Sequence, residues 1–455
     1  MQVIDPRTGR PTDSYPEMDA DAVEAALARA HDAFGSWRRV AFADRASLLR
    51  RVAEQFRARR DALAERMARE MGKPISQGRG EADKCAWVCE HYADHGAAYL
   101  APEPVDIDGV DAHVSYQPQG VLLSIMPWNF PLWQVMRQAA PALMAGNTVA
   151  LKHAANVPGC AEDLASVFSD AEAPEGLFEN LRIDHTLAEE VIRDRRVRAV
   201  TLTGSVRAGR AVGATAGEAL TPSVLELGGS DPYLVLEDAD LDRAVDKCVT
   251  SRLINSGQSC IAAKRWIVVD AVHDDFVARA LDAMRAKTVG DPLDAHTDVG
   301  PMAREDLRDG LHDQVTRSAE AGATVALGGE VPARDGWWYP PTLLTGVTPG
   351  MPAFDEELFG PAAAVIRADD EADAIALANR SSFGLGAAVF TRNVERGRRI
   401  AELELDAGAC FVNDFVKSDP RLPFGGVKDS GYGRELARAG ILALVNTKTV
   451  YVSVT

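Results

Sequence analysis

Short apolar runs alternate along the chain with longer stretches of helical periodicity. Five of the runs are short and mostly apolar and predict buried strands: residues 120–126, 148–152, 199–203, 224–227 and 233–236. Several stretches between them have the length of helices, as in residues 241–253. This alternation predicts an α/β protein with parallel sheets.

Two helical regions are predicted ahead of the first of these strands. Asp21 lies three residues before Glu24, which is the spacing of a capping box, and predicts a helix that ends near Phe34. Residues 44–71 carry apolar side chains mostly at helical spacing, and Gly72 is suited to the left-handed position that ends a helix. We interpret both regions as packing elements without chemistry.

Two stretches suggest a small β element apart from the main sheets. Residues 104–118 form short alternating pieces around Asp108-Gly109, which predicts a β-hairpin. Residues 447–454 have a strand pattern but no hairpin partner nearby in the sequence, and such an edge is normally paired or covered. We hypothesise that this element contacts another subunit.

Composition narrows the classes of partner. A chain of 455 residues is too long for one ordinary core, so two or three lobes are expected. The net charge of −18 argues against nucleic acid or an anionic membrane as a partner. Neither a membrane-spanning run nor a secretory signal pattern is present, which predicts a cytoplasmic protein. The six cysteines and nine histidines show no metal-ligand spacing, so no metal site is expected.

Two residues are candidates for covalent and acid–base chemistry. Cys260 follows a small polar loop and precedes an apolar strand, a position where a thiol of lowered pKa can act as a nucleophile. A lone cysteine is more often a small buried hydrophobe. Glu226 ends an apolar strand ahead of two glycines, where desolvation would raise its pKa as a general base requires. The alternative interpretation of Glu226 is a carboxylate at a strand end that is exposed to solvent.

A stiff aromatic loop, residues 127–133, follows the strand at 120–126. The Asn129 amide could donate to a developing oxyanion, although an asparagine in a loop is more often a turn residue. Arg137 lies one helical turn beyond Trp133, so it is expected at the same pocket, where a guanidinium could bind a carboxylate.

Two further features suggest a nucleotide site. Lys152 ends a predicted parallel strand, at the sheet edge where open α/β sheets bind nucleotides. Gly204-Ser205 opens a predicted helix whose N-terminus could accept phosphate, but the pattern is not GxGxxG and remains weak alone.

Taken together, these stretches resemble the NAD(P)-dependent aldehyde dehydrogenase superfamily over essentially the whole chain. Within this superfamily, the sequence is similar to that of the bacterial succinate-semialdehyde dehydrogenase branch. The pieces that carry the resemblance are PWNFP (127–131), Lys152, GSxxxG (204–209), LELGG (225–229), GQSC (257–260), EELFGP (356–361), and PFGG with SGYGRE (423–435).

The resemblance implies that the chain is divided into three structural parts. A Rossmann-like cofactor-binding domain would comprise residues 1–103 and 119–228, and an α/β catalytic domain residues 229–435. Residues 104–118 and 436–455 would form an oligomerisation element, in which the final strand usually pairs across a dimer. A homodimer or a dimer of dimers is expected.

The resemblance also implies roles. Cys260 would attack the aldehyde, Asn129 and the Cys260 N–H would hold the oxyanion, and Glu226 would activate the hydrolytic water. The cofactor-binding residues would be Met126, Trp128, Lys152, Ala155, Gly204, Ser205, Gly209, Leu227, Glu357 and Phe359. The substrate-binding residues would be Trp133, Arg137, Ser418 and Phe424, on a pocket that suits succinate semialdehyde.

The sequence leaves alternatives open for the cofactor and for the substrate. NAD-preferring members often carry a glutamate three positions after the lysine, where this chain has Ala155, so NADP is slightly favoured with NAD also accepted. Ala262 replaces a second cysteine found in some relatives, so a disulfide switch is not expected. Glu226 argues against a CoA-acylating enzyme. Two alternatives remain. One is an enzyme that oxidises a broad range of aliphatic or aromatic aldehydes, in which Arg137 would have a structural role. The other is a non-catalytic protein on the same scaffold.

Overall fold

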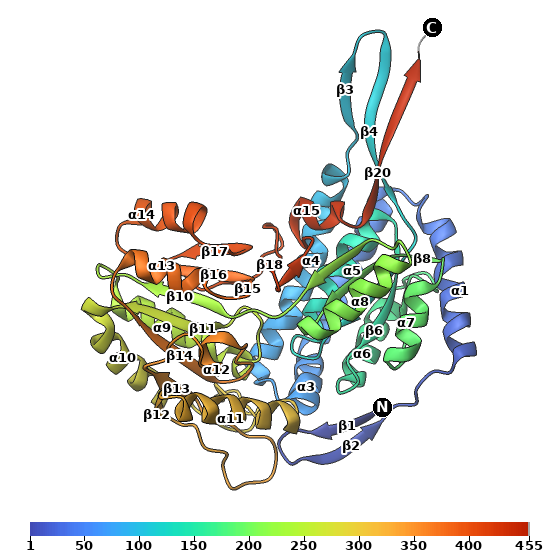
Figure 1. The fold of residues 1–455 in the computed structure, drawn as a ribbon. Coiled ribbons are helices and arrows are strands. Elements are labelled where there is room, and N and C mark those ends of the chain that lie inside the picture. Colours follow the sequence, from blue (N-terminus) through green and yellow to red (C-terminus); the bar gives the residue numbers. More distant parts are fainter. Residues whose placement is uncertain (454–455) are drawn as a thin grey trace.

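A mostly parallel six-stranded sheet is the centre of the first lobe in the computed structural model, which describes residues 1–453 (Figure 1). Its strand order is β19-β9-β8-β5-β6-β7, and only β19 runs antiparallel to its neighbour. The strands are β5 (Val121–Met126), β6 (Thr148–His153), β7 (Phe178–Asn180), β8 (Val197–Thr203), β9 (Ser223–Glu226) and β19 (Gly431–Tyr432).

Helices cover both faces of this sheet because alternate strand residues point to opposite sides. Leu122 of β5 packs into a large core with helices α2, α4 and α5, whereas Val121 and Leu123 pack into a separate core with α1 and α7. The helices of this lobe are α1 (Ala20–Trp37), α2 (Phe42–Ala58), α3 (Arg60–Met71), α4 (Ile75–Tyr99), α5 (Trp133–Ala145), α6 (Pro158–Asp170), α7 (His185–Arg193) and α8 (Val206–Glu218).

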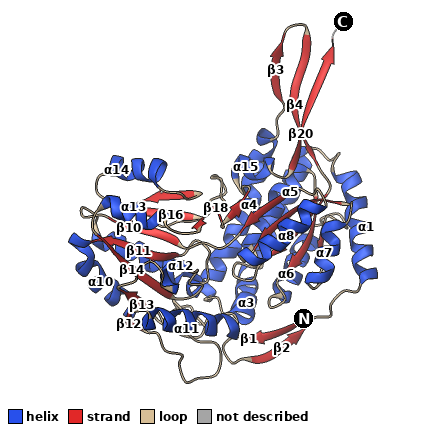
Figure 2. Ribbon diagram, in the orientation of Figure 1, coloured by secondary structure: helices blue, strands red, loops and turns tan. Residues whose placement is uncertain are grey.

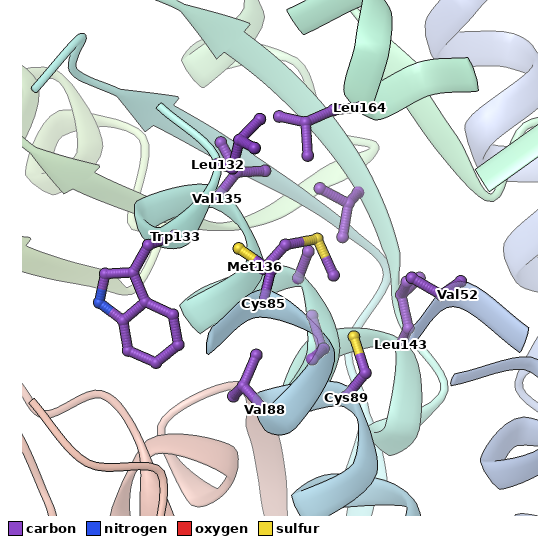
Figure 3. Close-up of a cluster of buried hydrophobic side chains, with 14 of the residues drawn as sticks. Val52, Cys85, Val88, Cys89, Leu132, Trp133, Val135, Met136, Leu143 and Leu164 are labelled. Atoms are coloured by element: carbon purple, nitrogen blue, oxygen red, sulfur yellow. The ribbon is translucent and has the colours of Figure 1, made fainter. Parts of the chain in front are cut away.

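The large core is where α4 and α5 meet. Figure 3 shows Cys85, Val88 and Cys89 of α4 beside Met136 and Leu143 of α5, all of them buried. The indole of Trp133 lies at the edge of this cluster in the same view. The first turn of α5 is therefore held against α4, which fixes the direction in which Trp133 points.

The helix predictions need three corrections. Asp19, not Asp21, caps α1, because its side chain accepts a hydrogen bond from the Ala22 N–H at 2.9 Å. The single helical region of residues 44–71 is two helices, α2 and α3, divided at Arg59. Gly72 does adopt the left-handed conformation that was predicted to end it, with φ of 76°.

The third correction is α4, a helix of 25 residues whose extent was not predicted from the sequence. Its glycines lower helix propensity and weakened the sequence signal. Tertiary packing requires them, however, because a Cβ at Gly78 would lie 3.0 Å from the Ala64 Cα, and a Cβ at Gly96 would collide with Met144.

A seven-stranded sheet forms the second lobe, in the order β12-β13-β14-β11-β10-β16-β17, with only β12 antiparallel to its neighbour (Figure 2). Its strands are β10 (Asp231–Val235), β11 (Ala263–Val269), β12 (Thr324–Leu327), β13 (Thr342–Thr345), β14 (Ala362–Ala368), β16 (Gly386–Phe390) and β17 (Ala409–Val412). Its helices are α9 (Leu241–Leu253), α10 (Asp270–Arg285), α11 (Glu305–Glu320), α12 (Pro352–Asp355), α13 (Glu371–Asn379) and α14 (Val394–Arg399).

Two small two-stranded sheets complete the two lobes. The chain begins with a hairpin of β1 (Gln2–Asp5) and β2 (Arg10–Ser14), and β15 (Phe383–Gly384) pairs with β18 (Val427–Lys428). Residues 431–432, which the sequence analysis placed in the catalytic domain, belong to the sheet of the first lobe as β19. No helix within residues 1–453 is long and apolar enough to cross a membrane.

A three-stranded sheet projects from the body of the molecule (Figure 1). The predicted hairpin is confirmed as β3 (Glu103–Ile107) and β4 (Val110–Pro118). The final strand, β20 (Val445–Ser453), pairs along its length with β4 of the same chain, after helix α15 (Ala437–Leu442). The final strand therefore joins the 104–118 hairpin within the chain, as the grouping of these residues in one element predicted, and its pairing across a dimer stays a prediction. Residues 454–455, assigned to the same element, lie outside the described part.

Candidate active site

Cys260 lies in a short loop between a 3₁₀ turn (Ile254–Gly257) and β11, and the cavity beside it is lined by residues of both lobes. Its side chain is half-buried and lines a cavity of about 280 Å³. The same cavity contains all the residues that were predicted to bind substrate: Trp133, Arg137, Ser418 and Phe424. Tertiary folding thus brings the proposed nucleophile and the proposed substrate residues together.

The cysteine loop is held in an unusual backbone conformation. Asn255 and Ser256 have φ of 56° and 54°, in the left-handed region that is costly for residues other than glycine. Gly257 follows with φ of 75°, and any Cβ there would collide with the Gly360 carbonyl. The glycine of GQSC therefore allows the loop to pack against the EELFGP segment.

Asn129 connects the aromatic loop to the cysteine loop. Its Nδ2 donates to the Gln258 backbone carbonyl at 3.0 Å, and the backbone carbonyl of Asn129 accepts from Asn255 Nδ2 at 2.6 Å. Asn129 is therefore more than a local turn residue, because its amide is fixed beside the loop that carries Cys260.

Glu226 is buried at the end of β9, with 2% of its surface exposed. Neither carboxylate oxygen has a hydrogen-bond partner within the described residues, and a Cβ at Gly425 would lie 2.7 Å from Oε1. Burial raises the pKa of Glu226 well above its usual value, and the nearby Glu435 raises it further. The desolvated glutamate that the sequence predicted is confirmed, and the solvent-exposed alternative is wrong.

The thiol of Cys260 is not activated by the protein alone. Burial raises its pKa to about 12, although Lys264 and Arg137 act in the opposite direction. Lys264 donates to the Cys260 carbonyl at 2.7 Å, close to the thiol. At neutral pH the thiol is protonated, so the formation of a thiolate needs a base.

Arg137 lines the cavity, but its charge is already paired. Its guanidinium forms a buried ion pair with Glu435 and donates to Thr203 Oγ1 at 3.2 Å. It also lies 4.7 Å from the centre of the Phe424 ring. No local pattern predicts this pairing, because Glu435 lies almost 300 positions away from Arg137 along the chain.

A second cation at the cavity was missed. Lys84 of α4 donates from Nζ to Ser418 Oγ at 2.8 Å, and the same Oγ accepts from Trp133 Nε1 at 3.1 Å. Since the extent of α4 was not predicted, no periodicity placed Lys84 near the residues around Trp133.

The predicted phosphate-binding residues lie at the strand ends of the first lobe. Lys152 is the last residue but one of β6 and is half-buried, and its amine has no ion-pair or hydrogen-bond partner within residues 1–453. Ser205 caps α8 at an exposed N-terminus, where Gly204 precedes it. A Cβ at Gly209 would lie 2.5 Å from Leu227, so this glycine lets α8 pack closely on the end of β9.

Other predicted cofactor residues lie near Lys264, which contacts the Cys260 carbonyl, and just beyond the end of β5. Glu357 accepts from the Gly229 N–H at 3.1 Å and forms an ion pair with Lys264 at 3.2 Å. The ring of Phe359 meets Trp128 edge to face at 5.7 Å, beyond Met126 at the end of β5. A helix N-terminus, a free lysine, a carboxylate and an aromatic ring are groups that fit a dinucleotide.

The comparison with protein families matches the sequence to the model of the aldehyde dehydrogenase family over residues 1–450. The chain belongs to the aldehyde dehydrogenase family. The resemblance noted from its motifs is confirmed. As an aldehyde dehydrogenase it is an enzyme, and the non-catalytic alternative is not supported.

Two bacterial relatives align with this aldehyde dehydrogenase over nearly its full length. It is 48% identical to a succinate semialdehyde dehydrogenase [NAD(P)+] of Escherichia coli, with 98% of this chain and 97% of the relative covered. It is also 48% identical to succinate-semialdehyde dehydrogenase [NADP(+)] 1 of Mycobacterium tuberculosis, with both chains covered completely.

Solved structures confirm the predicted fold class. Succinic semialdehyde dehydrogenase from Streptococcus pyogenes, in complex with NADP+, has a TM-score of 0.97 and 36% identity, with 99% of each chain covered. Succinate-semialdehyde dehydrogenase from Burkholderia pseudomallei also has a TM-score of 0.97, at 33% identity, with 100% of this chain and 94% of the other covered. This chain therefore has the aldehyde dehydrogenase fold.

Proposed function

We propose that this aldehyde dehydrogenase oxidises succinate semialdehyde to succinate with NADP or NAD. The observation that carries the proposal is the shared cavity, in which Cys260 lies with Arg137, Ser418 and Trp133. A substrate with an aldehyde at one end and a carboxylate at the other matches a thiol at one wall and polar donors at another. The names of the bacterial relatives support the same substrate.

In the proposed mechanism Cys260 first gives its proton to a base, and the resulting thiolate adds to the aldehyde carbon and forms a hemithioacetal. The second hydrogen of the Asn129 amide and the Cys260 N–H donate to the resulting oxyanion. Glu357 and Phe359 would hold the nicotinamide, which would supply the hydride acceptor, and loss of a hydride from this carbon would leave a thioester on Cys260. Glu226 takes a proton from water, which attacks the thioester, releases the carboxylate and restores the thiolate.

The substrate proposal is tested by comparing two aldehydes of equal length. Succinate semialdehyde and butanal both have four carbons, but only the first carries a carboxylate. We expect kcat/KM to favour succinate semialdehyde by about 100-fold or more, since butanal would leave the polar donors of the site without hydrogen-bond partners. Equal values would instead favour the broad-specificity aldehyde dehydrogenase.

For the cofactor, we propose that Lys152, Gly204 and Ser205 hold the adenosine ribose and phosphates. Glu357 would bind the nicotinamide ribose, and Phe359 would pack near the nicotinamide. The free amine of Lys152, with the exposed Ala155 three positions later, suits the 2′-phosphate of NADP.

Ala155→Glu should reverse this preference. A carboxylate at this exposed position would repel a 2′-phosphate and could accept from a ribose 2′-OH, so kcat/KM with NADP should fall by about tenfold or more relative to NAD. Ala155→Gln, which adds the same bulk without charge, is the matched control. If both variants shift the ratio equally, the effect is steric and Lys152 is not the phosphate site.

We further propose a cytoplasmic homodimer or dimer of dimers. The projecting sheet of β3, β4 and β20 supports the oligomer, because exposed strand edges are normally paired or covered. The six cysteines, all of them free thiols, support a reducing compartment.

A further inference from the structure

Lys84 places a second positive charge on the wall of the substrate cavity. The side chain comes from the middle of α4 and is half-buried. Its Nζ lies 4.2 Å from the centre of the Trp133 ring and donates to Ser418 Oγ at 2.8 Å. Both contacts hold the ammonium group at the cavity and leave its charge uncompensated, since an indole and a hydroxyl are neutral.

The carboxylates near Lys84 are engaged elsewhere. Glu81 accepts from the N–H groups of Leu132 and Trp133 at the start of α5 and forms an ion pair with Lys73. Asp419 forms an ion pair with Arg421 at 2.7 Å. Within residues 1–453 no carboxylate lies within ion-pair distance of Lys84. A partly buried ammonium without an anion is costly unless a ligand supplies one.

Arg137 differs in this respect. Its guanidinium is buried against Glu435, so the pair adds little net charge to the cavity. A substrate carboxylate at Arg137 would have to share this cation with Glu435, and the two anions would repel each other.

We propose that Lys84 is the cation that binds the distal carboxylate of the substrate, with Ser418 as its second donor. Arg137 is then a positioning residue that holds Glu435 and the Phe424 ring. This inference rests on the proposed semialdehyde substrate and names the residue that selects it.

Ser418 has one hydrogen available for this role. A hydroxyl group has two acceptor sites and one donor. Both acceptor sites of Ser418 Oγ are used, by Lys84 Nζ and by Trp133 Nε1. The O–H is therefore left to donate into the cavity, beside the two remaining N–H groups of Lys84. One carboxylate can accept from both residues.

Burial and the neighbouring Arg137 lower the pKa of Lys84 to about 8, while Cys85, Glu81 and Asp419 act in the opposite direction. At neutral pH the amine is still mostly protonated. A bound carboxylate stabilises the charged form, so the cost of holding the ammonium in the free enzyme falls when substrate binds.

The test is the ratio of kcat/KM for succinate semialdehyde to kcat/KM for butanal, in wild type and in Lys84→Met. Methionine is unbranched and only one atom shorter than lysine, so it keeps an apolar side chain near Trp133 but removes the charge. We expect the ratio to fall by about 30-fold or more, as for the loss of a hydrogen bond to a charged group. Lys84→Arg, which keeps the charge, should retain a ratio within about tenfold of wild type.

Lys417→Met is the matched control. Lys417 also lines the cavity, but its charge is paired with Asp414 at 2.7 Å, so its removal should leave the ratio within about threefold. Melting temperatures establish that each variant is folded, and Lys84→Gln replaces Lys84→Met if the latter is not.

A ratio unchanged in folded Lys84→Met, with wild type still selective, would overturn the inference and assign the carboxylate to Arg137. An equal fall in Lys417→Met would also overturn it, because any nearby charge would then suffice. A wild type without preference for succinate semialdehyde would refute the proposed function itself, and the role of Lys84 with it.

Discussion

Cys260→Ala should abolish the oxidation of aldehydes, with kcat lowered on the order of 10⁴-fold or more. No other described side chain of the cavity wall offers a thiol, so no substitute nucleophile is available for the covalent step. The fold should be retained, because the side chain is only half-buried and the loop is held by Asn129, Asn255 and Gly257. The measurement is steady-state formation of the reduced cofactor at 340 nm.

Cys410→Ala is the matched control for this variant. Cys410 of β17 is also half-buried, and burial raises the pKa of its thiol to about 11, much as for Cys260. It lies outside the cavity, so its loss should leave kcat within about twofold. Residual activity of Cys260→Ala above a tenth of wild type would rule out Cys260 as the nucleophile.

Glu226→Gln should uncouple the two halves of the reaction. Acylation of Cys260 would still form one equivalent of reduced cofactor per site, but hydrolysis of the thioester should slow by about 10²–10³-fold, since glutamine cannot accept a proton. A rapid burst followed by a slow steady state is the expected time course. Intact-protein mass spectrometry should detect the acyl group on Cys260.

The pH dependence gives a second measurement on Glu226. Because its pKa is raised, the carboxyl is protonated over a wider range of acid pH than an ordinary glutamate. Steady-state turnover of wild type should rise with pH as the proton is lost, and Glu226→Gln should lack this rise. The linkage also means that ionising Glu226 destabilises the fold as pH increases, so the glutamine variant should melt no lower than wild type at neutral pH. A variant with normal turnover would show that another group activates the water.

The sequence alone determined the features that depend on neighbouring residues. Helix α9 occupies the predicted residues 241–253, and the strand that precedes Glu226 is β9. The spacing of apolar residues and the residues at local turns specify such elements without reference to the rest of the chain. The motifs likewise predicted Cys260, Glu226 and Asn129 as nucleophile, base and oxyanion donor, since these roles need particular residue types.

Tertiary structure alone decided which charges are free at the cavity. The sequence predicted Arg137 at the cavity, but only the fold shows that Glu435 pairs with it, and Lys84 reaches Ser418 across 334 positions of sequence. The register in which β20 pairs with β4 is another such case. A side chain's net charge and hydrogen-bonding capacity at a site depend on which distant groups fold against it, and local sequence patterns carry no record of those contacts.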